Sequence, residues 1–278
     1  MGSKGENEDG FSDNFDDLGM DDPEFDQTPQ ALDPVYAERI AAYDADCADG
    51  AGPATACAHL AEFKGVVLNQ WREAARLFEL SCYHPRSDYV SPGCVDMGDG
   101  TEGYPAACFN LGKLAFSGQK PNIIAQSDAK ASEYFARACG GEHTPSCYHL
   151  AMLKLEGKGV KRDTATAIDL LGRACMDSEA MSCFQLGGML LRRPRIPGTG
   201  EKGDVDDLKI PRDPKRAVEL LEKGCNMGHA PACFNLSVIY KHGDDGVAAD
   251  PKKFAIFKSI TESLIKQQGG KLEGTQAL

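Results

Sequence analysis

The sequence has no long run of apolar residues and little positive charge. Its 278 residues contain 30 Lys and Arg against 42 Asp and Glu, which gives a formal net charge of −12. A membrane-spanning helix needs roughly 20 consecutive apolar residues, so we expect no membrane span. Nucleic-acid binding needs a basic face, so we expect no nucleic-acid partner. Hydrophobic residues still make up 42% of the chain, as in a soluble protein with a folded core.

The first residues also lack the features of common targeting segments. Met1-Gly2-Ser3-Lys4 leads into acidic residues, without an apolar stretch or an Arg-rich amphipathic stretch. We therefore expect neither a secretory signal nor a matrix presequence. Residues 1–30 hold ten acidic side chains and one lysine, so most of the net charge belongs to this segment. We predict a disordered acidic tail over 1–32 and a short polar tail over 267–278.

Cysteine, by contrast, is abundant, with 11 residues in the chain. This number favours an oxidising compartment, although the N-terminus indicates no secretory route to one. No two cysteines form a Cys-x-x-Cys pair of the thioredoxin type. Covalent haem attachment through Cys-x-x-Cys-His is excluded for the same reason.

The cysteines recur with a period. Three pairs share a Cys-x7-Cys spacing, and the pairs that begin at Cys139 and Cys175 lie 36 residues apart. Self-similarity at a fixed period is the signature of a repeat protein. A leucine stands three positions after one cysteine of every unit, in Cys57-Ala-His-Leu60, Cys108-Phe-Asn-Leu111, Cys147-Tyr-His-Leu150, Cys183-Phe-Gln-Leu186 and Cys233-Phe-Asn-Leu236.

Apolar residues within each unit have helical spacing. Ala167, Leu170, Leu171 and Ala174 lie three and four apart, as on one face of a helix. Glycine turns such as Gly157-Lys-Gly159-Val160 separate the helices, and Asp163 and Asp250 stand at N-cap positions, the latter before Pro251. No segment indicates a strand. We predict helices over 34–47, 53–65, 70–83, 105–117, 127–140, 145–156, 163–177, 179–191, 213–227, 229–242 and 250–266.

The predicted fold is all-α, a solenoid of about five helix-turn-helix repeats over residues 33–266. Such units bury their apolar faces only against neighbouring units, and their stack has a concave face. Segments 84–104 and 192–211 are rich in proline and glycine, and we predict both to be loop insertions.

The repeat resembles the Sel-one-like repeat family, a relative of the tetratricopeptide repeat. Leu111-Gly112, Leu186-Gly187, Gly157-x-Gly159-Val160 and Asp163 match its pattern. The cysteines place the resemblance in the cysteine-rich branch, which includes secreted bacterial proteins and mitochondrial assembly factors of cytochrome c oxidase. The mitochondrial members imply a soluble protein of the intermembrane space that enters without a cleaved presequence. Oxidation by the disulfide relay would retain it there.

The mitochondrial resemblance implies a non-catalytic binding scaffold in the biogenesis of cytochrome c oxidase. Its implied partners are assembly intermediates or copper chaperones, and we expect a monomer. Cys47 and Cys57 have the Cys-x9-Cys spacing found in relay substrates. A cytosolic or secreted adaptor with the same repeats is an alternative, and so is a thiol–disulfide reductase that acts on other assembly factors.

The cysteines of each unit are expected to form disulfides. A Cys-x7-Cys pair ends one helix and begins the next, so its Cα atoms can approach to bridging distance. We predict five bridges and leave Cys94, in a loop, as the free thiol. The alternative is that the cysteines are small buried core residues. The predicted pairs are Cys47–Cys57, Cys82–Cys108, Cys139–Cys147, Cys175–Cys183 and Cys225–Cys233.

A row of polar residues precedes the leucine anchors, and we call its members the ladder residues. In related repeats, amide side chains at this position hydrogen-bond the backbone of an extended peptide; the alternative is a hydrogen bond within the repeat. The ladder residues are His59, Asn110, His149, Gln185 and Asn235.

The sequence carries no firm indication of a metal or a cofactor. Cys139, His143, Cys147 and His149 can be drawn as a metal site, but the repeat already explains the cysteines. Haem binding remains an alternative through His229 near Met227 or His149 near Met152. Gly198-x-Gly200-x-x-Gly203 matches a dinucleotide fingerprint without the required strand. The sequon Asn235-Leu-Ser237 falls within a predicted helix.

Overall fold

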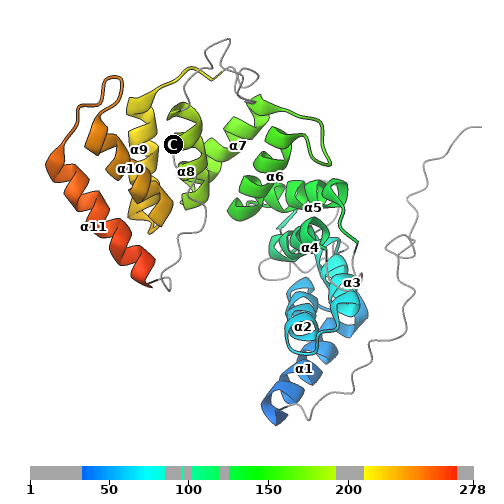
Figure 1. Ribbon diagram of the computed structural model, residues 1–278. Helices are drawn as coiled ribbons and strands as arrows, with labels where there is room; N and C mark the ends of the chain where they lie inside the picture. Colours follow the sequence, from blue (N-terminus) through cyan, green and yellow to red (C-terminus); the bar gives the residue numbers. More distant parts are fainter. Residues whose placement is uncertain (1–32, 85–94, 97–101, 119–124, 192–209, 268–278) are drawn as a thin grey trace, which may run out of the picture. The chain divides into compact units, whose positions relative to one another are not determined.

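The computed structural model describes residues 33–84, 95–96, 102–118, 125–191 and 210–267, and these form an all-α fold (Figure 1). Every predicted helix is confirmed to within one residue at each end. A short 3-10 turn, η2 (Ala48–Gly50), follows the first helix. The α-helices are α1 (Pro34–Cys47), α2 (Ala54–Val66), α3 (Trp71–Cys82), α4 (Pro105–Ser117), α5 (Asp128–Gly140), α6 (Thr144–Glu156), α7 (Thr164–Met176), α8 (Ala180–Leu191), α9 (Pro214–Asn226), α10 (Ala230–His242) and α11 (Pro251–Gln267).

The chain divides into two compact units, and the division falls within α5. Unit 1 comprises Met1–Ala131 and unit 2 comprises Ser132–Leu278. In unit 1, helices α1 to α4 each pack against the next helix along the chain. In unit 2, α6 to α11 do the same, and Figure 1 shows α8, α9, α10 and α11 side by side. Helical hairpins that pack against their neighbours are the arrangement expected of stacked repeats.

The two helices of a repeat differ in how much of their surface is buried. The second helix, such as α7, buries one face, which contains the predicted residues Ala167, Leu170, Leu171 and Ala174. The first helix lies between neighbours: α10 packs against both α9 and α11. Between Ala230 and Tyr240, only Phe234 and Val238 are less than fully buried. The core of the repeats is therefore centred on the first helices.

The predicted helix ends are confirmed by their hydrogen bonds. The Asp163 carboxylate accepts a hydrogen bond from the backbone N–H of Thr166 at 3.1 Å, which caps α7. Asp250 caps α11 in the same way, accepting from the N–H groups of Lys252 and Lys253 at 2.9 and 3.1 Å. Gly157 ends α6 in the left-handed conformation, with φ 69° and ψ 28°. Local sequence therefore fixes these boundaries.

Gly187 of the Leu-Gly pair permits close packing of α8 on α9. A Cβ atom at this position would lie 3.0 Å from Cγ of Leu221, which is fully buried. A larger residue here would force the two helices apart or displace Leu221. The Leu-Gly pair of the repeat thus has a packing role.

One of the predicted loop insertions contains a short sheet. Strand β1 (Val95–Asp96) pairs antiparallel with β2 (Glu102–Gly103), where the sequence indicated no strand. Two-residue strands are too short to show an alternating pattern, so the sequence carries no signal for them. The tails at 1–32 and 268–278 and most of the second insertion, 192–209, lie outside the described residues.

Candidate functional site

Five disulfides connect the end of one repeat to the start of the next. They join the ten cysteines in the expected pairs, and the paired Cα atoms lie 4.7 or 4.8 Å apart, within the usual range for a disulfide. Each pair lies within one unit. The bridges are Cys47–Cys57 and Cys82–Cys108 in unit 1, and Cys139–Cys147, Cys175–Cys183 and Cys225–Cys233 in unit 2.

The three Cys-x7-Cys turns share one backbone geometry. The residue before the N-cap of the second helix is left-handed in each, with φ of 64° at Glu142, 69° at Ser178 and 82° at Gly228. The N-cap amide then donates to the carbonyl of the residue before the first cysteine, at 2.9–3.1 Å. This reversal brings the two helix ends together, so the bridge requires no further bending of the chain.

A second contact recurs at every bridge. The sulfur of the second cysteine lies 3.5–3.8 Å from the carbonyl oxygen of the first. A bridged sulfur carries no proton, so this is a sulfur–oxygen contact and not a hydrogen bond. Its repetition shows that the five bridges occupy equivalent places in their repeats.

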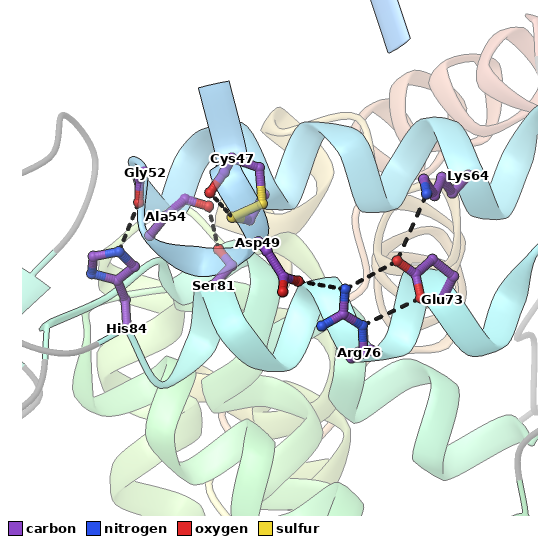
Figure 2. The surroundings of a disulfide bond; sticks show 10 residues. Cys47, Asp49, Gly52, Ala54, Lys64, Glu73, Arg76, Ser81 and His84 are labelled. Carbon is purple, nitrogen blue, oxygen red and sulfur yellow. Dashed lines mark hydrogen bonds and ion pairs between the residues drawn. A yellow bond between two sulfur atoms is a disulfide. The ribbon is translucent and has the colours of Figure 1, made fainter. Parts of the chain in front are cut away.

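The first bridge lies in a turn held by side chains of α3 and of the residues that follow it (Figure 2). The Ser81 hydroxyl donates to the carbonyl of Ala54 at 2.6 Å, and Nε2 of His84 donates to the carbonyl of Gly52 at 2.8 Å. A Cβ atom on Gly52 would lie 1.7 Å from the carbonyl oxygen of Asp46, so no other residue fits this turn. The loop between Cys47 and Cys57 is therefore anchored at two of its own carbonyls, those of Gly52 and Ala54.

Arg76 adds an ionic contact to the same turn. Its guanidinium donates to Asp49 at 2.7 Å and to Glu73 at 3.2 and 3.3 Å (Figure 2). The hydrogen bonds to Glu73 and then Asp49 raise the pKa of Arg76 further. Sequence reasoning missed Arg76, Ser81 and His84, because their partners in the turn lie 27–32 residues away along the chain.

The first and last turns of unit 2 use a different support, a histidine at the N-cap. Nδ1 of His143 lies 2.8 Å from the hydroxyl of Ser146, three residues later. His229 occupies the same place in the last turn, but position 232 is alanine, and its buried Nδ1 has no partner among the described residues. Burial lowers the pKa of both histidines. The spacing His-x-x-Ser is a local signal that could have been found in the sequence.

Replacing Ala232 with serine is expected to give His229 the missing hydrogen bond. The change copies the His143–Ser146 pair, and we expect it to stabilise unit 2 by about 1 kcal/mol, the usual net value of one hydrogen bond. Urea denaturation followed by hydrogen exchange of α9 and α10 measures the change. The same substitution in a His229→Ala background should give no gain, and an equal gain there would contradict the assigned contact.

The five bridges differ in exposure. Eight bridged cysteines are at most 4% exposed, whereas Cys139 and Cys147 are both partly exposed. Gly140 follows Cys139, and a Cβ atom there would meet nothing within 4 Å. Methionine and asparagine occupy this position in the turns after Cys175 and Cys225. The third bridge is therefore the one whose two cysteines are both partly exposed.

In unit 1 the two ladder residues contact groups of the chain itself. The ring of His59 lies 5.2 Å from that of Tyr43, centre to centre. Nδ2 of Asn110 donates to Oε1 of Glu62 on α2 at 3.4 Å, a long hydrogen bond at the surface. His59 is thus packed, while Asn110 is accessible.

In unit 2 the three ladder residues have different surroundings. His149 stacks on Phe135, with ring centres 4.9 Å apart and planes 15° apart. Gln185 is half-buried, and Asn235 is only 4% exposed. Neither amide has a side-chain hydrogen bond with a described residue. The same sequence position thus holds a packed ring, an accessible amide and a buried amide.

Metal and haem ligands receive little support from the geometry. Within the described ranges, no group of three or more His, Cys, Asp or Glu side chains could hold a metal ion. Cys139 and Cys147 are consumed by their disulfide, and His149 is stacked on Phe135. His229 packs against Phe184, with ring centres 4.8 Å apart. Haem binding through His229 or His149 stays an untested alternative.

The structure bears on three other features of the sequence: the glycosylation sequon, the glycine pattern and the expected absence of a membrane span. Asn235 and Ser237 of the sequon lie on α10 and are 4% and 5% exposed, so the sequon is buried within the fold. Cys94 and the glycine pattern at 198–203 lie outside the described residues. No helix in the part of the chain that the structure describes has both the length and the apolar character to cross a membrane.

Comparison with known proteins identifies the repeat. The Sel1 repeat model matches residues 105–143, 144–178, 201–229 and 230–257. Human cytochrome c oxidase assembly factor 7 is 35% identical over 95 residues, which cover 34% of either chain. The protein of the same name from Xenopus tropicalis is 27% identical over 179 residues, covering 53% of this chain and 74% of that protein.

The match to the human relative thus spans about a third of its length. Among solved structures, a Sel1 repeat protein from Oxalobacter formigenes superposes with a TM-score of 0.59 at 16% identity, covering 82% of this chain and 84% of the other. At this identity the likeness concerns the fold alone. Residues 105–178 and 201–257 therefore match the Sel1 repeat, and the chain has the α-solenoid fold of the Sel1 repeat protein from Oxalobacter formigenes.

Proposed function

We propose that this chain is a non-catalytic protein-binding scaffold of the mitochondrial intermembrane space that assists the biogenesis of cytochrome c oxidase. The observation that carries the proposal is its similarity to proteins named cytochrome c oxidase assembly factor 7, over 179 residues in the frog relative. Sel1 repeats are helical hairpins whose stacked first helices offer an extended surface to partner proteins. Assembly intermediates or copper chaperones are the proposed partners.

The bridges support the proposed compartment. Five disulfides in one chain are typical of an oxidising environment and are rare where glutathione keeps thiols reduced. In the chain-entropy model, a nine-residue loop such as that of Cys175–Cys183 stabilises by about 2.5 kcal/mol. Oxidation would thus favour the folded scaffold and retain it in the intermembrane space.

The test of the function is a deletion in the cells that make this protein. Loss of the chain is expected to lower the amount of assembled cytochrome c oxidase and its activity, and expression of the wild-type chain should restore both. Normal oxidase assembly in the deletion strain would contradict the proposal.

The proposed compartment is tested by counting the free thiols of the protein taken from its own cells, with acid quenching, alkylation and mass spectrometry. One free thiol is expected, and eleven would contradict the intermembrane-space location.

The accessible amides of the ladder, Asn110 in unit 1 and Gln185 in unit 2, are each proposed to hydrogen-bond an extended partner segment. Asn110→Ala combined with Gln185→Ala removes two amides that have at most one long hydrogen bond within the chain. We expect this variant to restore less than about a third of the oxidase activity in the deletion strain, because two partner hydrogen bonds are lost. Its protein level and thermal midpoint should stay at the wild-type values.

A matched control places the same number of alanines on the outer face of α7. Asp169 and Arg173 form an exposed ion pair at 3.2 Å, and such pairs contribute little to stability. Asp169→Ala with Arg173→Ala should restore full activity. Full activity of the Asn110/Gln185 variant would show that the ladder has no role in binding.

A further inference from the structure

The starting observation is the unequal exposure of the five bridges. Cys139 and Cys147 are both partly exposed, while the cysteines of the other four bridges are 0–4% exposed. Thiol–disulfide exchange requires a thiolate to approach a sulfur atom in line with the S–S bond, so access decides which bridge reacts. Residue exposure thus favours the third bridge as the one that a thiol reaches in the folded chain. The other four must first be exposed by local opening, which costs free energy.

The helix ends on either side of this bridge give the reaction a direction. Cys147 lies in the first turn of α6, where the positive end of the helix dipole stabilises a thiolate. Cys139 is the second-last residue of α5, where the negative end destabilises one. The sulfur that leaves more readily is the one with the lower thiol pKa. An incoming thiolate should therefore attack Cys139 and release Cys147.

We propose that the Cys139–Cys147 bridge is a thiol-exchange site, at which a small thiol of the glutathione class forms a mixed disulfide with Cys139. The attacking thiolate forms the new S–S bond to Sγ of Cys139, and the electron pair of the old bond passes to Sγ of Cys147. A second thiolate can then displace Cys139, giving the oxidised small disulfide and a reduced cysteine pair. The other four bridges stay intact.

The chain contains a close control for this chemistry. Cys175–Cys183 has the same sequence separation of 8 and a Cα–Cα distance of 4.7 Å against 4.8 Å for Cys139–Cys147. Its cysteines also lie at the end of one helix and in the first turn of the next. The two bridges share loop length and polarity and differ in exposure, at 2% and 0% for Cys175 and Cys183.

The experiment uses the full-length oxidised protein, with free thiols blocked by N-ethylmaleimide. Reduced glutathione is added under native conditions, samples are quenched in acid, and new thiols and glutathione adducts are located by mass spectrometry. We expect Cys139–Cys147 to open faster than Cys175–Cys183 by roughly tenfold or more, the ratio for a modest local opening cost. The first adduct should be on Cys139. Equal rates, earlier opening of another bridge, or an adduct mainly on Cys147 would overturn the proposal.

Two single-substitution variants measure how accessible Cys139 and Cys175 are, without reduction of any bridge by glutathione. Cys147→Ser leaves Cys139 as a lone thiol at the exposed site, and Cys183→Ser leaves Cys175 at the buried one. Under native conditions, N-ethylmaleimide should label Cys139 roughly tenfold faster than Cys175, since only Cys175 needs local opening. Equal labelling rates would contradict the proposal. Should either variant fail to fold, the wild-type experiment decides by itself.

Discussion

Removal of the Cys82–Cys108 bridge is expected to cause the largest single loss of stability in unit 1. Both cysteines are completely buried, and the sequence separation of 26 makes this the longest loop among the five bridges. In the chain-entropy model, closing such a loop stabilises the folded state by about 3.5 kcal/mol. Cys82→Ala with Cys108→Ala should lower the free energy of unfolding by this amount.

The measurement can use the fluorescence of Trp71, the single tryptophan of the chain. Trp71 begins α3 in unit 1, and its ring lies against Gly65: a Cβ atom there would lie 2.7 Å from Cζ3. Unfolding of unit 1 separates the ring from this contact and exposes it to water. Urea denaturation followed by this signal gives the stability of unit 1.

The other bridge of unit 1 is the matched control. Cys47–Cys57 has a sequence separation of 10, and the same model gives about 2.8 kcal/mol for its loop. Cys47→Ala with Cys57→Ala should therefore destabilise unit 1 by about 0.7 kcal/mol less than the Cys82/Cys108 variant. An equal or larger loss for the shorter loop would show that chain entropy is not the main contribution of these bridges.

The helices and the bridge pairs could be predicted because both are encoded locally. Residues such as Leu170 and Leu171 follow the helical period, and Asp163 and Gly157 mark helix boundaries through contacts within a few residues. The cysteines of a Cys-x7-Cys pair are brought together by a single turn. None of these features depends on how distant parts of the chain pack.

The features that were missed depend on long-range packing. Arg76 contacts Asp49 across 27 residues, and nothing in the local sequence of either residue indicates the other. The greater exposure of Cys139 and Cys147 depends on the residues that pack around their turn. The Cys-x7-Cys spacing does not predict it, because all three pairs have the same spacing. The ladder residues share a sequence position, yet their contacts differ. His149 stacks on Phe135, whereas Asn110 donates a hydrogen bond to Glu62. Neighbours therefore decide what each ladder residue contacts.

Arg212 is another such residue, and its contacts join three segments of unit 2. Its Nε donates to the carbonyl of Leu191, the last residue of α8, at 3.2 Å. Its two terminal nitrogens pair with Asp244 and Asp245 in the turn that follows α10. The side chains of Arg212 and Asp244 are each only 13% exposed. One guanidinium thus holds together the end of α8, the start of α9 and the α10–α11 turn.

Replacing Arg212 with methionine is expected to lower the free energy of unfolding of unit 2 by about 3 kcal/mol. Methionine keeps much of the buried volume but removes the charge opposite Asp244, and removing one partner of a buried ion pair is strongly destabilising. Arg212→Lys should recover only part of the loss, because a single ammonium cannot reproduce the forked contact with two carboxylates. Hydrogen exchange of peptides from α8 to α11 measures the change.

An exposed ion pair of the same unit is the control for Arg212. Lys258 and Glu262 lie 3.8 Å apart on α11, with side chains 57% and 66% exposed. Because water screens this pair, Lys258→Met should cost less than about 0.5 kcal/mol. Trp71 fluorescence should report an unchanged unit 1 in both variants. A loss for Arg212→Met no larger than for Lys258→Met would show that the three segments are held by their apolar contacts, chiefly those around Leu190 and Leu221, and not by the guanidinium.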